Sequence, residues 1–153
     1  MNENMKKALE AAQKGSHNHE GGPFGAVIVD KTGKIIAQAN NQVLKNNDPT
    51  AHAEIMAIRE ACQKLGTHDL TGYSIYTSCE PCPMCLSAII WSNITTVYYA
   101  CTRADAAKIG FRDDQIYCYL AGEQKDLLSL ITMDREECLK VFEQYEKENG
   151  TIY

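Results

Sequence analysis

Apolar and polar residues follow the periods of short helices and strands in the first half of the chain. Residues 4–14 have a helical period, whereas residues 25–30 and 35–40 are apolar, β-forming runs on either side of a turn-like segment. These two runs predict a β-hairpin. A polar loop at residues 41–50 comes next. The apolar period of the residues that follow predicts a helix, and residues 48–50 include one that can cap it.

Helix and strand alternate in the middle of the chain. Residues 74–78 and 96–100 are predicted strands, and the nearly all-apolar segment between them, residues 82–91, favours a helix. A strand, a helix and a second strand in this order predict parallel pairing and a sheet that is covered on both faces.

The C-terminal third has weaker signals. Residues 103–120 are rich in helix-forming residues without clear boundaries, and residues 127–131 are a candidate last strand. Asp134 and Glu137 have the spacing of a capping box, which predicts a helix that continues to about Asn149. We therefore expect an α/β protein, a three-layer α/β/α sandwich around a mixed sheet of about five strands.

Composition and charge narrow the classes of function. The 15 basic and 20 acidic side chains give a net charge of -5, which disfavours binding to nucleic acid through clustered Lys and Arg. We expect no membrane span and no secretory signal, hence a cytoplasmic protein. The seven cysteines then serve as reduced thiols or metal ligands. No linker or repeat divides the sequence, so we expect one domain over residues 1–153.

Two short motifs carry the candidate chemistry. Cys82 and Cys85 lie at positions i and i+3 at the start of a predicted helix, so both sulfurs can face one point. His52 adds an imidazole, and a tetrahedral zinc with three protein ligands keeps one position for water, which is typical of a catalytic site. The pattern H-x-E followed by P-C-x-x-C is itself the known signature of zinc nucleobase deaminases.

Glu54 lies two residues after His52, about 200° further around a helix. Both side chains can therefore flank one metal ion only if the helix points its N-terminus at that ion. In that position the Glu54 carboxylate would be a general base for a water molecule whose pKa the metal has lowered toward about 7.

Two other interpretations of the cysteines are open. Cys79 and Cys82 form a second C-x-x-C pair, so a thioredoxin-like redox dithiol is possible. Cys79 could instead join His52, Cys82 and Cys85 in a closed, purely structural zinc site. We favour a catalytic zinc because a redox motif gives no reason for His52 and Glu54.

These motifs make the chain similar to the cytidine deaminase-like superfamily and, within it, to the bacterial guanine deaminases. The resemblance covers most of the chain and is carried by residues 21–27, 46–54, 76–85 and 106–111 and by the terminal Tyr153. It implies that His52, Cys82 and Cys85 bind one zinc ion per chain and that Glu54 moves protons. The substrate contacts that it implies are Phe24, Asn41, the backbone of Ala53, Asp113 and Tyr153, with Asp114 as an alternative to Asp113.

The activity implied by the resemblance is hydrolysis of guanine to xanthine and ammonia. Guanine presents N–H donors around C2, and a carboxylate accepts two such hydrogen bonds well. The resemblance also implies a homodimer that is domain-swapped through the tail at about residues 150–153, which covers the pocket. The expected partners are a small purine base and water, with no nucleic acid and no membrane.

Three alternatives to this function remain. Cytosine, guanosine or another base could be the substrate, because the metal motif is common to the superfamily. A tRNA adenosine deaminase would share the zinc motif, but net acidity and an obstructing tail disfavour a polynucleotide. A zinc-stabilised binding module without turnover would tolerate replacement of Glu54.

Overall fold

The computed structural model describes all residues from Met1 to Tyr153 and divides them into two compact units, residues 1–117 and 118–153. Helix α6 (Asp114–Leu120) begins in the first unit and ends in the second. In chain order the first unit contains α1 (Glu3–His17), β1 (Gly25–Val29), β2 (Ile35–Asn40), α2 (Val43–Asn46), α3 (Ala53–Leu65), β3 (Ser74–Cys79), α4 (Pro83–Trp91), β4 (Thr96–Cys101), α5 (Arg103–Lys108) and the start of α6 (Asp114–Leu120).

The four strands of the first unit form one mixed sheet in the order β2-β1-β3-β4. Strand β1 is antiparallel to both β2 and β3, and β3 is parallel to β4, as the strand–helix–strand pattern predicted. The sheet has four strands and not about five, because the predicted strand at residues 127–131 does not form. Those residues lie in the second unit, which contains no strand whose backbone groups could pair with them.

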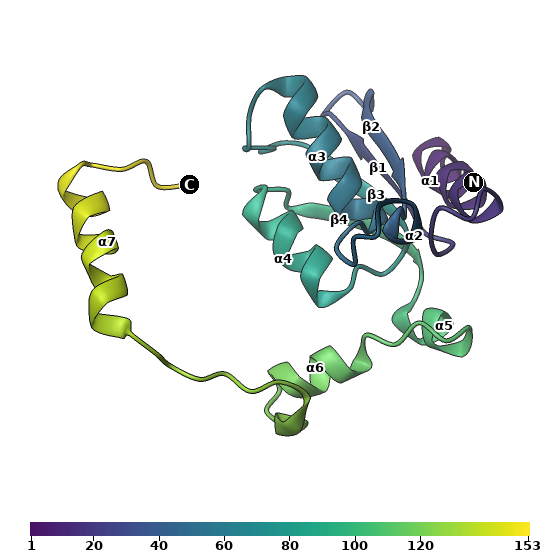
Figure 1. The fold of residues 1–153 in the computed structure, drawn as a ribbon. Helices are drawn as coiled ribbons and strands as arrows, with labels where there is room; N and C mark the ends of the chain where they lie inside the picture. Colours follow the sequence, from purple (N-terminus) through teal and green to yellow (C-terminus); the bar gives the residue numbers. More distant parts are fainter. The chain divides into compact units, whose positions relative to one another are not determined.

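Helices cover both faces of the sheet, so the predicted three-layer sandwich is confirmed (Figure 1). Side chains alternate along β1, and Val27 and Val29 pack toward α1, where they meet Ala8. Ala26 and Ile28 belong to the larger core cluster on the opposite face, which includes residues of α3 and α4. The α3 residues that are fully buried in this core are alanines, which allow the helix to lie close to the strands.

The connection between β2 and α3 differs from the prediction in two ways. It contains the short helix α2, where a polar loop was expected. Residues 48–50 form a turn, in which the Asp48 carboxylate accepts hydrogen bonds from Thr50, and do not cap the following helix. The N-cap of α3 is His52, whose backbone is extended and whose side chain makes no capping hydrogen bond. The imidazole of His52 is therefore available for other contacts.

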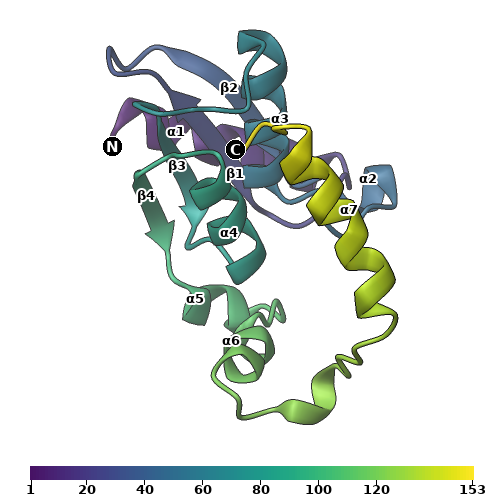
Figure 2. The same cartoon turned by 90° about the vertical axis from the view of Figure 1, so that its left-hand side faces the viewer.

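The second unit consists of the end of α6, the 3-10 helix η1 (Lys125–Leu127) and α7 (Arg135–Lys147) (Figure 2). The prediction of a helix here is confirmed, but the predicted capping box is wrong. Asp134 is the N-cap residue with φ 50°, and its side chain makes no capping bond, since a capping side chain needs an extended backbone. The helices of the structure include none with the length and apolar character that a bilayer span requires.

Candidate active site

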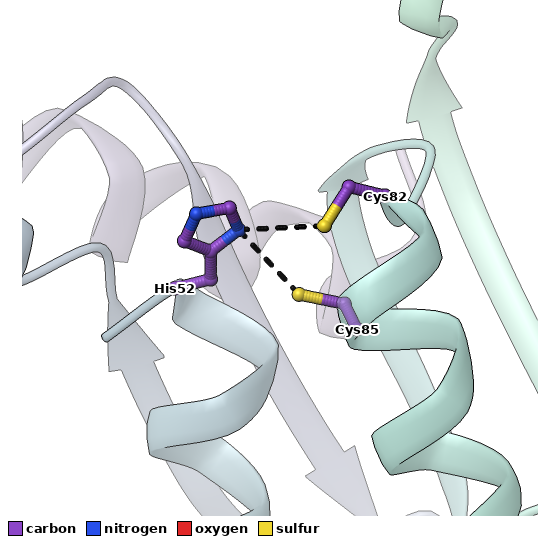
Figure 3. Close-up of side chains that lie close together, drawn as sticks. All are labelled: His52, Cys82 and Cys85. Carbon is purple, nitrogen blue, oxygen red and sulfur yellow. Dashed lines mark hydrogen bonds between the residues drawn. The ribbon is translucent and has the colours of Figure 1, made fainter. Parts of the chain in front are cut away.

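Helices α3 and α4 of the first unit begin close to each other, and the predicted ligand side chains lie at their N-terminal ends. His52 is the N-cap of α3 and Cys82 the N-cap of α4, and neither side chain caps its own helix. Pro83 occupies the first turn of α4, where its missing N–H costs no hydrogen bond. Figure 3 shows the imidazole of His52 directed at the sulfurs of Cys82 and Cys85.

The distances between these three side chains fit a tetrahedral zinc ion. His52 Nδ1 lies 3.6 Å from Cys82 Sγ and 3.5 Å from Cys85 Sγ, and the three ligand atoms are all within 4.8 Å of one another. Zinc at its usual bond lengths to sulfur and nitrogen would hold two such ligands about 3.6 Å apart in a tetrahedron. The predicted residues therefore form a group that could hold this metal.

The protonation of the group also suits a divalent cation. Hydrogen bonds from the Cys85 thiol and from His52 lower the pKa of Cys82 to about 4, although burial opposes this shift. The pKa of Cys85 is raised because its proton is held against Cys82 and because it is buried. The pKa of His52 is raised mainly by its hydrogen bond to Cys82. A zinc ion would take the place of the protons on Cys85 and His52, leaving two thiolates as ligands.

Cys79 is not a member of the ligand group. Its thiol donates a hydrogen bond to the backbone oxygen of Thr102, with a distance of 3.6 Å between Sγ and O. Burial is the main cause that raises the pKa of Cys79 to about 11, so this thiol is a poor source of thiolate. The geometry disfavours the closed four-ligand site and leaves a three-ligand group of His52, Cys82 and Cys85.

Glu54 lies in the first turn of α3 and is only 7% exposed. Burial raises the pKa of its carboxyl group, and the negative charge of Cys82 adds to this effect. The helix N-terminus does point at the ligand group, as the combination of His52 and Glu54 required. A carboxyl group in this position can accept a proton and hold it, which is the property of a general acid–base catalyst.

A cavity of about 600 Å³ lies beside this group, a size typical of small-molecule sites. It combines apolar walls with a few charged and polar groups. The predicted residues that line it are Phe24, Asn41, His52, Glu54, Cys82 and Asp113.

Asn41 is only 4% exposed, and its side-chain oxygen accepts a hydrogen bond from the backbone N–H of Val43 at 3.1 Å. A Cβ atom at Gly21 would lie 2.1 Å from the same oxygen. Glycine at position 21 is therefore required for Asn41 to occupy this position. Since the oxygen is engaged, the Nδ2 group of Asn41 is the part of the amide that can serve a ligand.

Phe24 forms an aromatic wall together with Phe111. The ring centroids are 4.9 Å apart in an edge-to-face arrangement. A Cβ atom at Gly22 would lie within 3 Å of both rings, so the glycine allows the two rings to pack there. The sequence analysis gave Phe111 no role of its own, because its contact with Phe24 joins segments far apart in the chain.

The two neighbouring acidic residues are placed differently. Asp113 is half-buried and lines the cavity, whereas Asp114 is exposed and does not. The side chain of Ala53 packs in the core and only its backbone is left for a ligand. Tyr153 belongs to the second unit and its side chain is 78% exposed.

Glu80 and Arg103 also line the cavity, and sequence analysis gave neither a role. Glu80 directly follows β3 and Arg103 is the second residue after β4. These strands are parallel, and their carboxyl ends meet at one edge of the sheet, where α/β proteins place ligand sites. That rule could have identified both residues.

An α/β/α fold with a His-Cys-Cys group and a buried glutamate at two helix N-termini defines the zinc-dependent nucleobase deaminases as a class. The sequence comparison agrees with this structural assignment. The chain belongs to the cytidine and deoxycytidylate deaminase zinc-binding family, which matches residues 1–101.

Several relatives are known. A guanine deaminase from Bacillus subtilis (strain 168) is 54% identical over 113 residues, which are 74% of this chain and 72% of that protein. An X-ray structure of guanine deaminase from Bacillus subtilis superposes with a TM-score of 0.90 and 43% identity, and the match covers 96% of this chain and 95% of that one.

Other relatives are less similar. A tRNA-specific adenosine deaminase from Aquifex aeolicus is 45% identical over 96 residues, 63% of this chain and 62% of that protein. A mutant of the protein NE0047, crystallised with 8-azaguanine, superposes with a TM-score of 0.68 and 35% identity over 72% of this chain and 63% of that one.

Proposed function

We propose that this protein is a zinc-dependent guanine deaminase, a hydrolase that converts guanine and water to xanthine and ammonia. The observation that carries the proposal is the buried Glu54 carboxyl beside the group of His52, Cys82 and Cys85, at a cavity that Asp113 also lines. The similarity to a guanine deaminase along nearly the whole chain supports guanine as the base. The purine analogue bound by NE0047 supports a small purine ligand.

The metal site of this proposal consists of His52, Cys82 and Cys85, which hold one zinc ion per chain. The ligand distances support this assignment, because they match the spacing of a tetrahedral site. When bound, the zinc ion supplies a Lewis acid that makes water a nucleophile near neutral pH. The cysteines must be reduced to act as ligands, so we also propose that the protein works in the cytoplasm.

Glu54 moves the protons of the reaction in this proposal. Its carboxylate takes a proton from the attacking water and delivers it to the ring nitrogen next to C2. It then takes the remaining proton of the new hydroxyl group and delivers it to the amino group, which leaves as ammonia. The carboxylate is regenerated, so the two protons of water are accounted for. The raised pKa of Glu54 suits a group that is protonated and deprotonated in each cycle.

The remaining cavity residues orient the base. The Asp113 carboxylate accepts hydrogen bonds from the amidine N–H groups of guanine. The Nδ2 group of Asn41 donates to an acceptor of the base, as does the backbone N–H of Ala53. Phe24 supplies an apolar wall against the flat ring, supported from the side by Phe111.

A substrate panel tests the proposal directly. Purified protein is incubated with guanine, guanosine, cytosine, adenine and an adenosine-containing tRNA anticodon stem-loop, and the release of ammonia is measured. We expect guanine to have the highest kcat/KM, at least about 10-fold above the next substrate. Ammonia release from the stem-loop alone would instead support the second candidate, a tRNA adenosine deaminase. That candidate is favoured by the similarity to tRNA-specific adenosine deaminases, such as the 45% identity to the Aquifex aeolicus protein.

We further propose that the protein is a homodimer. Helix α4 is apolar in nearly every position, and such a helix is normally buried, yet Ile90 and Trp91 are 71% and 68% exposed. Tyr98 and Tyr99 of the edge strand β4 are also exposed. Exposed apolar residues on a helix and a sheet edge are typical of a surface that contacts a second copy.

The C-terminal tail, residues 150–153, is proposed to act as the lid of the pocket within a single deaminase domain, and to be exchanged between the two subunits. Ile152 and Tyr153 are exposed apolar residues at the end of the chain. The pocket presents apolar walls that such residues could cover. A lid of this kind would exclude bulk water from the reaction.

Deletion of residues 150–153 is expected to lower kcat/KM for guanine by about 10-fold or more, because the base would be held in an open, hydrated pocket. The midpoint of thermal unfolding and the zinc content should change little, since none of the four deleted residues is buried in the core. Steady-state kinetics and thermal unfolding check this. Normal turnover of guanine by the truncated protein would disprove the lid.

A further inference from the structure

Asp113 lies in a segment with little regular structure. Residues 109–113 connect α5 to α6, and Phe111 and Arg112 are exposed. The backbone oxygen of Asp113 accepts hydrogen bonds from Ile116 and Tyr117, so the residue opens helix α6. A carboxylate that reads a base must be held within a fraction of an ångström of its working position. Contacts outside this segment must therefore fix α6 to the sheet.

Arg103 makes such contacts through its backbone and through its side chain. Its backbone N–H donates to Glu80 Oε2 at 3.0 Å, and Thr102 caps the helix α5 that Arg103 begins. The guanidinium carbon lies 4.4 Å from the centroid of the Tyr117 ring, so the cation stacks on the face of this ring. A planar guanidinium can stack on a ring in this way, whereas an ammonium group cannot. Arg103 thus connects the carboxyl edge of the sheet to the first turn of α6.

The charge of Arg103 also acts on Asp113. Burial and the negative charges of Cys82 and Glu80 raise the pKa of Asp113, whereas a backbone hydrogen bond at Asp113 and the guanidinium of Arg103 lower it. Arg103 is therefore the cationic side chain that favours the ionised carboxylate at this edge of the cavity. An ionised carboxylate accepts stronger hydrogen bonds from N–H donors than a neutral one.

We propose that Arg103 is a positioning residue for substrate recognition: by stacking on Tyr117 and attracting Asp113, it holds the Asp113 carboxylate toward the amidine edge of the base. This inference rests on the proposed function. The inference gives Arg103 a role in recognition of the base, although Arg103 is neither a metal ligand nor a proton carrier.

A double-mutant cycle tests the inference. Arg103→Ala should raise KM for guanine by about 10-fold while kcat falls less than about 3-fold, because an orienting contact is lost and Glu54 is untouched. Asp113→Asn should raise KM by a similar or larger factor. In the Asp113→Asn background, Arg103→Ala should add less than about 2-fold, because the residue acts through Asp113. Arg103→Lys keeps the charge but loses the stack and should recover only part of the affinity.

Lys108→Ala is the matched control. It removes one positive charge from the same helix, α5, where Lys108 forms only an exposed ion pair with Asp105, and it should leave KM unchanged. Equal effects of Arg103→Ala in both backgrounds would overturn the inference and leave the proposed function intact. A wild-type protein that does not deaminate guanine would overturn the proposed function instead.

A measurement that does not depend on turnover distinguishes a failure of the inference from a failure of the proposed function. Amide hydrogen exchange of residues 113–117 should become several-fold faster in Arg103→Ala and stay unchanged in Lys108→Ala, since Arg103 stacks on Tyr117 whereas Lys108 pairs with Asp105. Unchanged exchange in Arg103→Ala would overturn the inference whatever the substrate.

Discussion

Glu54→Gln is expected to lower kcat for guanine by about 10²–10⁴-fold or more while the protein keeps its zinc and its fold. Glutamine has the shape of glutamate but cannot accept a proton from water or pass one to the base. Glu54 is not a member of the ligand group, so metal binding should persist. Ammonia-release kinetics, metal analysis and thermal unfolding of the purified variant measure the three quantities.

Glu60→Gln provides the matched control for this experiment. Glu60 lies on the same helix, α3, and pairs with Lys64 on the surface, so its replacement should leave turnover within about 2-fold of wild type. If Glu54→Gln turned over guanine at the wild-type rate, Glu54 would have no place in the mechanism. A non-catalytic zinc module would then be the better interpretation.

Cys85→Ser is expected to remove most of the bound zinc, from about one ion per chain to less than about one tenth, and to abolish deamination with it. Serine is a weak zinc ligand, because its hydroxyl does not ionise near neutral pH as a thiol can. Cys85 is fully buried next to His52 and Cys82, and no other member of the group can replace its sulfur. Metal analysis after exhaustive dialysis, together with ammonia release, checks both effects.

The exposed thiol of Cys138 on α7 offers the control, since Cys138→Ser should change neither zinc content nor rate. Retention of a full zinc ion by Cys85→Ser would mean that the metal is held elsewhere. A protein that contains no zinc and forms a reversible Cys79–Cys82 disulfide would instead support the redox interpretation.

The sequence was sufficient for the parts of the site that are local. The spacing from Cys82 to Cys85 and from His52 to Glu54 depends only on helix geometry, and both motifs lie at helix N-termini as expected. The hairpin and the parallel pair of strands also follow from short-range patterns. These features need only a few neighbouring residues, so their structure can be predicted before the fold is known.

Other features required the tertiary structure. The contact between Phe24 and Phe111 and the place of Arg103 between Glu80 and Tyr117 join segments whose separation no periodicity encodes. Asp113 and Asp114 are chemically alike, and only the start of α6 decides that Asp113 faces the cavity.

The sequence by itself predicted the group of His52, Cys82 and Cys85, the neighbouring Glu54 and the layered α/β architecture, because these depend on residue type and on helical or strand period. Only the tertiary structure decided that the sheet has four strands and that residues 127–131 are not among them. An apolar run becomes a strand only where another strand offers its backbone N–H and C=O groups, and that depends on the whole fold.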